Sequence, residues 1–199
     1  MKKILFFFPV LMSVFILTNC TEHKDTKNAL PPIHKNDLSS ELMILNDSVI
    51  LKWNQMMAAD SQKFADIKRL LEEISYCKKY NEKEFEELMI FRNKVYDERY
   101  TIDNITDSKI DQYDSLTTLL INKVRNLKSK TPEILQHPLA DQLENEILKA
   151  DNEDLIQFRK HYDAIAEKYN SLLDQNKEAI EKDLNLQSFK KRKLFAVAS

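Results

Sequence analysis

The chain has 199 residues, of which 43 % are hydrophobic and 31 % are charged, and its 30 basic side chains nearly balance 32 acidic ones. This composition is typical of a globular domain with one apolar core. The sequence contains no glycine, although average usage of about 7 % would give roughly fourteen. A chain without glycine has no Gly-rich phosphate loop, no G-x-S-x-G nucleophile elbow and few ways to close a tight β-hairpin. We therefore expect an all-helical protein.

The first twenty residues resemble the export signal of a bacterial lipoprotein. Two lysines precede an apolar run at residues 4–17, which is shorter than the ~20 residues of a membrane-spanning helix. The run leads into Leu17-Thr18-Asn19-Cys20, which resembles a lipobox, although Asn19 stands where a small residue is usual. We expect residues 1–19 to be a signal peptide and Cys20 to carry the lipid. An ordinary signal peptide and an uncleaved anchor are the alternatives.

Residues 20–37 are predicted to be a flexible tether that leads to a helical domain at 38–199. The segment contains Pro31-Pro32 and has no periodic apolar pattern. The sixteen residues from Thr21 to Asn36, as a coil, have a root-mean-square reach of ~20–25 Å, which lifts a domain off the lipid headgroups without sending it far. We expect the body of the chain to lie outside the cytoplasm, in the bacterial cell envelope, and to face the periplasm or the cell surface.

The first predicted helix starts near Leu38 and carries apolar residues at spacings of three and four, the period of an amphipathic helix. The pattern fits one helix of about forty residues, or two helices stacked end to end. Its apolar positions are Leu42, Leu45, Val49, Trp53, Met56, Phe64, Ile67, Leu71 and Ile74. Residues 78–81 interrupt it, and Asn81 with Glu84 resembles a capping pair that starts a second helix.

Three further segments complete the predicted helices. Residues 101–107 are rich in Asp, Asn and Thr, which compete with helical hydrogen bonds, so we expect a loop there. An apolar stripe follows at residues 110–127. Thr131-Pro132-Glu133 predicts a helix start with Thr131 as N-cap. A last helix over residues 138–183 would be ~70 Å long.

The last predicted helix carries a seam whose members alternate steps of three and four residues, which is typical of packed long helices. The seam consists of Leu155, Phe158, Tyr162, Ile165, Tyr169 and Leu172. Long amphipathic helices bury their stripes by lying along one another. The expected fold is therefore an all-α, elongated antiparallel bundle of three to four long helices.

Parts of the sequence resemble the LemA family. Residues 159–170 are similar to its Arg-x-x-Tyr-Asn-x-x-Val-x-x-Tyr-Asn stretch, with Asp163 in place of the first Asn. Thr131-Pro132-Glu133-Ile134 is similar to its Tyr-Pro-x-Leu turn, and Trp53 with residues 67–74 keeps the spacing of its Trp and Leu-Ile-Pro-Asn-Leu-Val stretch. The resemblance covers most of residues 38–195. It implies an elongated helical bundle tethered at the envelope, and it implies neither an enzyme nor a known ligand.

Side chains that could carry chemistry form no catalytic or metal-binding motif. Glu-x-x-His, His-x-x-x-His and Cys-x-x-Cys are all absent from the sequence, so we expect no metal site and no cofactor. Cys77 lies on an apolar helix face, which favours a buried, inert thiol over a redox role. Trp53, Tyr162 and Tyr169 lie on apolar stripes, which favours core packing over a partner-binding groove.

The C-terminal segment is basic in a chain that is otherwise acidic. Between Phe189 and Phe195 stand four cations, namely Lys190, Lys191, Arg192 and Lys193. Near a lipid tether such a segment could touch anionic headgroups, at about 1 kcal/mol per cation, or contact a partner. The alternative is a solvated tail with Phe189 or Phe195 packed on the bundle.

Together these features predict a non-enzymatic, lipid-anchored helical protein of the bacterial cell envelope that acts through protein–protein contacts. Its partners are expected to be the membrane, through the lipid on Cys20, and an envelope protein that the sequence does not identify. We expect no nucleic acid and no small-molecule substrate. The alternative function is a periplasmic chaperone-like or adhesin-like binding module.

Overall fold

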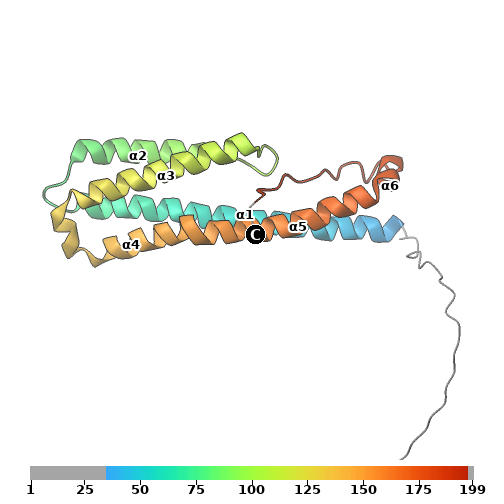
Figure 1. The fold of residues 1–199 in the computed structure, drawn as a ribbon, viewed down its shortest axis with the longest axis horizontal. Coiled ribbons are helices and arrows are strands. Elements are labelled where there is room, and N and C mark those ends of the chain that lie inside the picture. The colour runs from blue at the N-terminus through green and yellow to red at the C-terminus, as the bar shows by residue number, and fades with distance from the viewer. Residues whose placement is uncertain (1–34, 197–199) are drawn as a thin grey trace, which may run out of the picture. The chain divides into compact units, whose positions relative to one another are not determined.

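The structure, a computed structural model, describes residues 35–196, and all its regular elements are helices (Figure 1). Successive helices alternate in direction along one axis, except that the helices over residues 138–149 and 155–175 continue in the same direction, so the predicted all-α bundle of long antiparallel helices is confirmed for this unit. The predicted signal peptide, the lipid site Cys20 and nearly all of the predicted tether lie outside the described residues.

Helix α1 (Lys35–Ser75) is a single uninterrupted helix of 41 residues, which decides between the two arrangements that the sequence pattern allowed. It contains neither proline nor glycine, so nothing in its interior removes a backbone hydrogen bond. The helix is ~60 Å long and contacts α2, α3, α4 and α5 along its length. It is therefore the central element of the unit.

A hairpin of α2 (Glu82–Asp97) and α3 (Asp107–Ser129) packs on the C-terminal half of α1 (Figure 1). Asn81 caps α2 as predicted, because its Oδ1 accepts the Glu84 amide at 3.1 Å. Thr106 caps α3 by accepting the Lys109 amide at 3.3 Å. The loop between the two helices brings Tyr100 against the core.

The chain returns along α1 through α4 (Pro138–Lys149), a π-helical turn (Ala150–Asp154), α5 (Leu155–Gln175) and the short α6 (Lys177–Lys182). The prediction of one helix over residues 138–183 is therefore wrong at two points. The π-helical turn interrupts it, and α5 ends at Gln175 because the Asn176 side chain donates to the Leu172 carbonyl at 2.9 Å.

The predicted helix start at Thr131 is right in position, but the predicted side-chain cap is absent and the helix that begins there is short. The Thr131 hydroxyl donates to the Leu127 carbonyl at 3.0 Å instead of capping the next turn. The residues after Thr131 form only a 3-10 turn, Pro132–Gln136. The hydroxyl thus closes the end of α3, a use of Thr that competes with the capping role.

The core seam of α5 agrees with the predicted seam in part. Tyr162 and Tyr169 are fully buried, whereas Phe158 and Ile165 are only partly buried. Ala166, which the prediction omitted, is fully buried. The difference follows from the helical repeat of 3.6 residues, which drifts from a strict step of 3.5.

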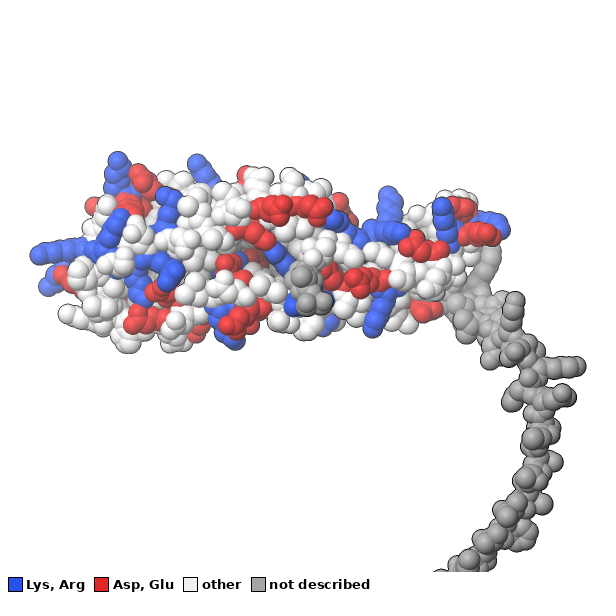
Figure 2. Space-filling view, in the orientation of Figure 1, with Lys and Arg blue, Asp and Glu red and all other residues white. Residues whose placement is uncertain are grey.

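Charged side chains of both signs are spread over the face of the unit that Figure 2 shows. Lys and Arg alternate with Asp and Glu over the face in Figure 2, without a large field of either sign. Among the described residues, none of the helices combines the length and the apolar character needed to cross a bilayer.

Candidate functional site

After α6 the chain turns back and runs without regular structure along the bundle, as the dark red segment in Figure 1. We call residues 189–196 the strap. The strap ends beside the middle of α1 and α5, where Phe195 is only 9 % exposed. A non-helical segment thus completes the core of a helical protein.

Two Tyr–Asx pairs on α5 hold the strap backbone. The Asn170 side chain donates to the Arg192 carbonyl and accepts the Arg192 amide, both at 2.8 Å. Asp163 accepts the Phe195 amide at 2.8 Å, and the Tyr162 hydroxyl donates to the Lys193 carbonyl at 3.1 Å. The strap is therefore bound through its main chain.

The spacing of these contacts follows from helix and strand geometry. Asn170 lies seven residues after Asp163 on α5, a rise of about 10.5 Å. Arg192 and Phe195 lie three residues apart in the extended strap, a span of about 10 Å. The two spans match, so an extended segment running antiparallel to α5 finds both side chains in register.

Phe195 fills a socket of aromatic side chains from three parts of the chain. Its ring stacks on Trp53 with centroids 6.2 Å apart and meets Tyr162 edge-on at 5.5 Å. Tyr100 lies at 6.0 Å, and the Arg159 guanidinium lies 5.0 Å from the ring centroid. We call the strap-holding residues the cradle: Trp53, Tyr100, Tyr162, Asp163 and Asn170.

Arg159 ties the socket to the hairpin. Its guanidinium donates to both oxygens of Asp114, at 2.6 and 2.7 Å, and to the Tyr100 hydroxyl at 3.0 Å. Burial alone would lower the pKa of this guanidinium, but Asp114 and Tyr100 raise it above its ordinary value. Burial also raises the pKa of Tyr100 to about 12. Both groups therefore keep their ordinary charge at neutral pH.

A cluster of buried polar and charged side chains lies next to this socket. The Tyr113 hydroxyl donates to Asp60 at 2.6 Å. Lys63, 2 % exposed, lies 3.2 Å from the other Asp60 oxygen as an ion pair without hydrogen-bond geometry. Lys63 also donates to Asp151 of the π-helical turn at 2.9 Å. The charged groups are paired, so this cluster fixes α1 against α3 and the π-helical turn.

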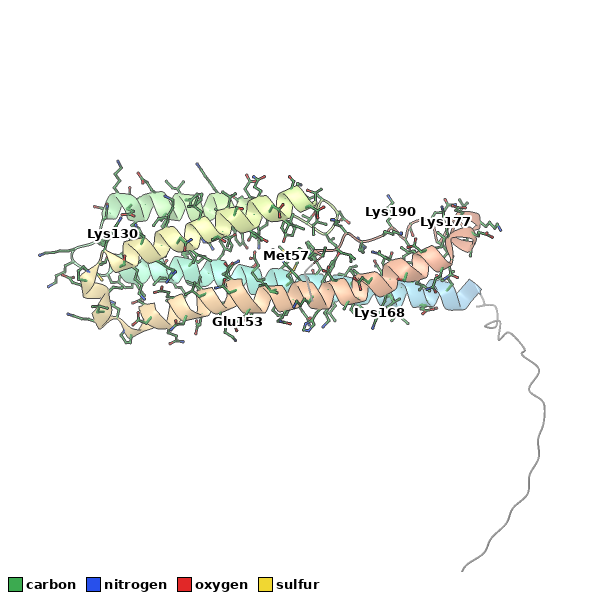
Figure 3. All side chains as sticks on the ribbon, in the orientation of Figure 1. Met57, Lys130, Glu153, Lys168, Lys177 and Lys190 are labelled. Atoms are coloured by element: carbon green, nitrogen blue, oxygen red, sulfur yellow. The ribbon has the colours of Figure 1, made fainter. Side chains whose placement is uncertain are left out.

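The four predicted contact cations all lie on the strap, and acidic residues of the bundle pair with three of them. Arg192 lies 3.3 Å from Asp103, and Lys191 lies 2.6 Å from Asp174. Lys193 lies 2.8 Å from Asp107. Lys190, labelled in Figure 3, is exposed and has no ion pair with any described residue. The basic residues therefore lie opposite an acidic rim, which consists of Asp103, Asp107 and Asp174.

The strap leaves a hollow of about 490 Å³ between itself and the bundle. Asn46, Ile102, Ile105 and Tyr169 line the hollow from the bundle side. The buried Tyr169 hydroxyl, beside the Lys190 backbone, and the buried Arg192 Nε form no well-aligned hydrogen bond there. The fit between strap and bundle is thus close at Phe195 and looser at residues 189–193.

The remaining predicted residues behave as core or surface groups. Trp53, Tyr162 and Tyr169 are buried, as expected for core packing. Cys77 is buried as expected, but it lies in the turn after α1 and not on a helix face, and burial raises the pKa of its thiol. His161 is exposed and His137 lies 3.2 Å from Glu73. Within residues 35–196, no group of His, Cys, Asp and Glu has the arrangement of a metal site.

Sequence reasoning did not identify Asp163, Asn170 and Arg159 as residues that hold the C-terminal segment. The signal was present as two Tyr–Asx pairs seven residues apart, but the sequence does not say what such pairs contact. Comparison with protein-family models, with curated proteins and with solved structures found no match for this chain.

Proposed function

We propose that the chain is a lipoprotein of the bacterial cell envelope, anchored through Cys20, that works through protein contacts and not through catalysis. The observation that carries the proposal is the basic start and apolar run that lead into Leu17-Thr18-Asn19-Cys20. In this arrangement the lipid holds the helical unit at the membrane. The residues between Cys20 and α1 act as the tether.

An apolar stripe on the first half of α1 supports a role in protein contacts. Met43, Ile44 and Leu51 are 54 %, 66 % and 55 % exposed, and Ile50 is 38 % exposed. Residues seven apart lie on the same face of a helix, two turns from each other, so these four side chains form one strip. No described residue covers the strip. Exposed apolar strips of this kind are typical of protein-binding surfaces.

The interior of the unit supports contacts over catalysis. The hollow beside Asp60 and Arg159 has a volume of about 10 Å³, which is the size of a single water molecule. The buried carboxylate of Asp60 faces Lys63 and the Tyr113 hydroxyl. A buried carboxylate that is paired with a cation and a hydroxyl stabilises the packing of the helices that carry these groups.

The second candidate is a chaperone-like or adhesin-like binding module. The hollow of about 490 Å³ along the strap favours it, because Ile102, Ile105 and the basic side chains of the strap line an open surface there. A scaffold engages one defined partner, whereas a chaperone-like module engages many clients. Cross-linking in intact cells therefore separates the two by the number of proteins captured.

We also propose that the chain is a divergent relative of the LemA family. The support is the pair of Tyr–Asx steps at Tyr162-Asp163 and Tyr169-Asn170, together with the order of the other matching stretches. In the structure both steps contact or face the strap. Both steps therefore have a structural use in this chain.

The lipid anchor is tested by Cys20→Ser in cells fed a labelled fatty acid. We expect the label to disappear from the protein and the protein to leave the detergent phase. Cys77→Ser is the matched control, since its thiol is buried, and it should keep both label and partitioning. A Cys20→Ser protein that still carries labelled fatty acid would contradict the anchor.

A further inference from the structure

We propose that the cradle is a docking site for an extended, basic segment of another protein that presents an aromatic anchor, and that the strap is its resident intramolecular occupant. The inference deepens the proposed role in protein contacts and rests on it. It names where the partner binds and what the bound segment looks like.

The contacts of the cradle with the strap backbone do not depend on sequence. Asn170 binds both main-chain polar groups of one residue, and Asp163 binds the amide three residues further on. Any extended segment offers groups at this spacing. Recognition of a main chain by fixed side chains or strand edges is a common mode of peptide binding.

Specificity comes from the socket and the rim. The socket of Trp53, Tyr100 and Tyr162 accepts one planar aromatic side chain. The rim of Asp103, Asp107 and Asp174 pairs with basic side chains before the anchor. The segment that fits best is therefore extended, basic and followed by an aromatic residue.

The strap does not satisfy the whole groove. The hollow of about 490 Å³ lies beside residues 189–193, and on the bundle side the buried Tyr169 hydroxyl forms no well-aligned hydrogen bond. A partner with a larger side chain and an acceptor at this position fills the hollow and pairs with the Tyr169 hydroxyl. Such a partner gains contacts that the strap lacks.

Exchange of the strap leaves the hydrogen bonds within the helices in place, although it uncovers the aromatic socket until the anchor of the partner enters it. The strap makes no helical hydrogen bonds, and a turn at residues 183–188 joins it to α6. A covalently joined segment competes at an effective concentration of the order of millimolar. The partner must therefore bind the empty cradle more tightly than the strap does, or be concentrated at the same membrane.

The experiment measures binding of a labelled peptide with the sequence of residues 188–199 to the full chain in detergent micelles. We expect Phe195→Ala in the chain to tighten binding of this peptide about tenfold or more, because the resident strap loses its anchor. A peptide with Ala in place of its Phe should bind that chain about tenfold more weakly. The only tryptophan, Trp53, reports occupancy of the socket by its emission.

Arg192→Ala is the second strap variant, in case Phe195→Ala unfolds the chain. It removes contacts with Asp103 and Asn46 at the surface, and it should tighten peptide binding by a smaller factor. Lys168→Ala on the exposed face of α5 (Figure 3) is the matched control and should leave binding unchanged.

Two results would overturn the proposal. In the first, the peptide binds the wild-type chain and both strap variants equally or not at all. In the second, the wild-type chain is a dimer that Phe195→Ala dissociates, which makes a second copy the occupant. Neither result depends on Cys20, so failure here is separate from failure of the lipid anchor.

Discussion

Asn170 completes both backbone hydrogen bonds of Arg192, at 2.8 Å each, so one amide side chain on a helix serves the strap as a neighbouring strand would. The primary amide matches a peptide group because it holds a donor and an acceptor side by side. An aspartate at this position would offer only acceptors when ionised. The two hydrogen bonds with the Arg192 main chain therefore favour an amide side chain at position 170.

Asn170→Ala should destabilise the protein by about 1–3 kcal/mol, because it leaves the amide and carbonyl of Arg192 without partners. Thermal unfolding followed by circular dichroism measures the change, and Trp53 emission reports loosening of the strap. Asn122→Ala on the exposed face of α3 is the control. Equal shifts in the two variants would show that the strap does not depend on Asn170.

Lys63→Met should destabilise the unit by about 3–5 kcal/mol, because it leaves the buried Asp60 carboxylate without its cation. Lys123→Met on the exposed surface of α3 should change stability by less than ~0.5 kcal/mol. The double variant Asp60→Asn, Lys63→Met should recover part of the loss in urea unfolding. A double variant as unstable as the sum of the singles would contradict the pairing.

Stability should fall as the pH rises from about 10 to 12. Burial raises the pKa of both Tyr100 and Tyr162 from the ordinary 10.0 to about 12. Both phenols thus stay neutral in the folded protein at pH values where they ionise in the unfolded chain, so their contribution is complete below pH 10 and lost as pH approaches 12. Urea unfolding across this range measures the slope, and Tyr162→Phe should flatten it. An unchanged slope in that variant would contradict the assignment.

Cys77 should react slowly with a soluble thiol reagent until the protein unfolds. The side chain is 4 % exposed and burial raises the pKa of its thiol, so little thiolate is accessible. A Ser115→Cys, Cys77→Ser variant, which places the thiol on the exposed face of α3, should react at once. Fast reaction of Cys77 in the native protein would point to local opening of this end of the bundle.

The apolar periodicity of the sequence was enough to predict the helices, because a stripe at spacings of three and four allows few other structures. It placed α1, α2 and α3 and most of the buried face of α5. It could not place the strap, since residues 189–196 have no period, and an extended segment is defined by what it packs on. The roles of Asp163 and Asn170 depend on that same long-range contact.

The π-helical turn at Ala150–Asp154 was hidden from periodicity for a different reason. The turn adds one residue between the apolar stripes of α4 and α5, which both face α1. The sequence pattern over residues 138–175 is therefore that of one slightly irregular helix. The lipid site stays a prediction of the sequence alone, since Cys20 lies outside the described residues.

The same turn determines where the long returning helix tolerates a change in length. A π turn holds about one residue more than an α turn, so removal of Asn152, which is exposed, converts the turn to α-helix without rotating the flanking stripes. Removal of a residue within α5 instead rotates every later side chain by about 100° and carries Tyr169 off the core. The bundle therefore tolerates a change in length at residues 150–154. A change in length within α5 would shift the residues that hold the strap out of register with it.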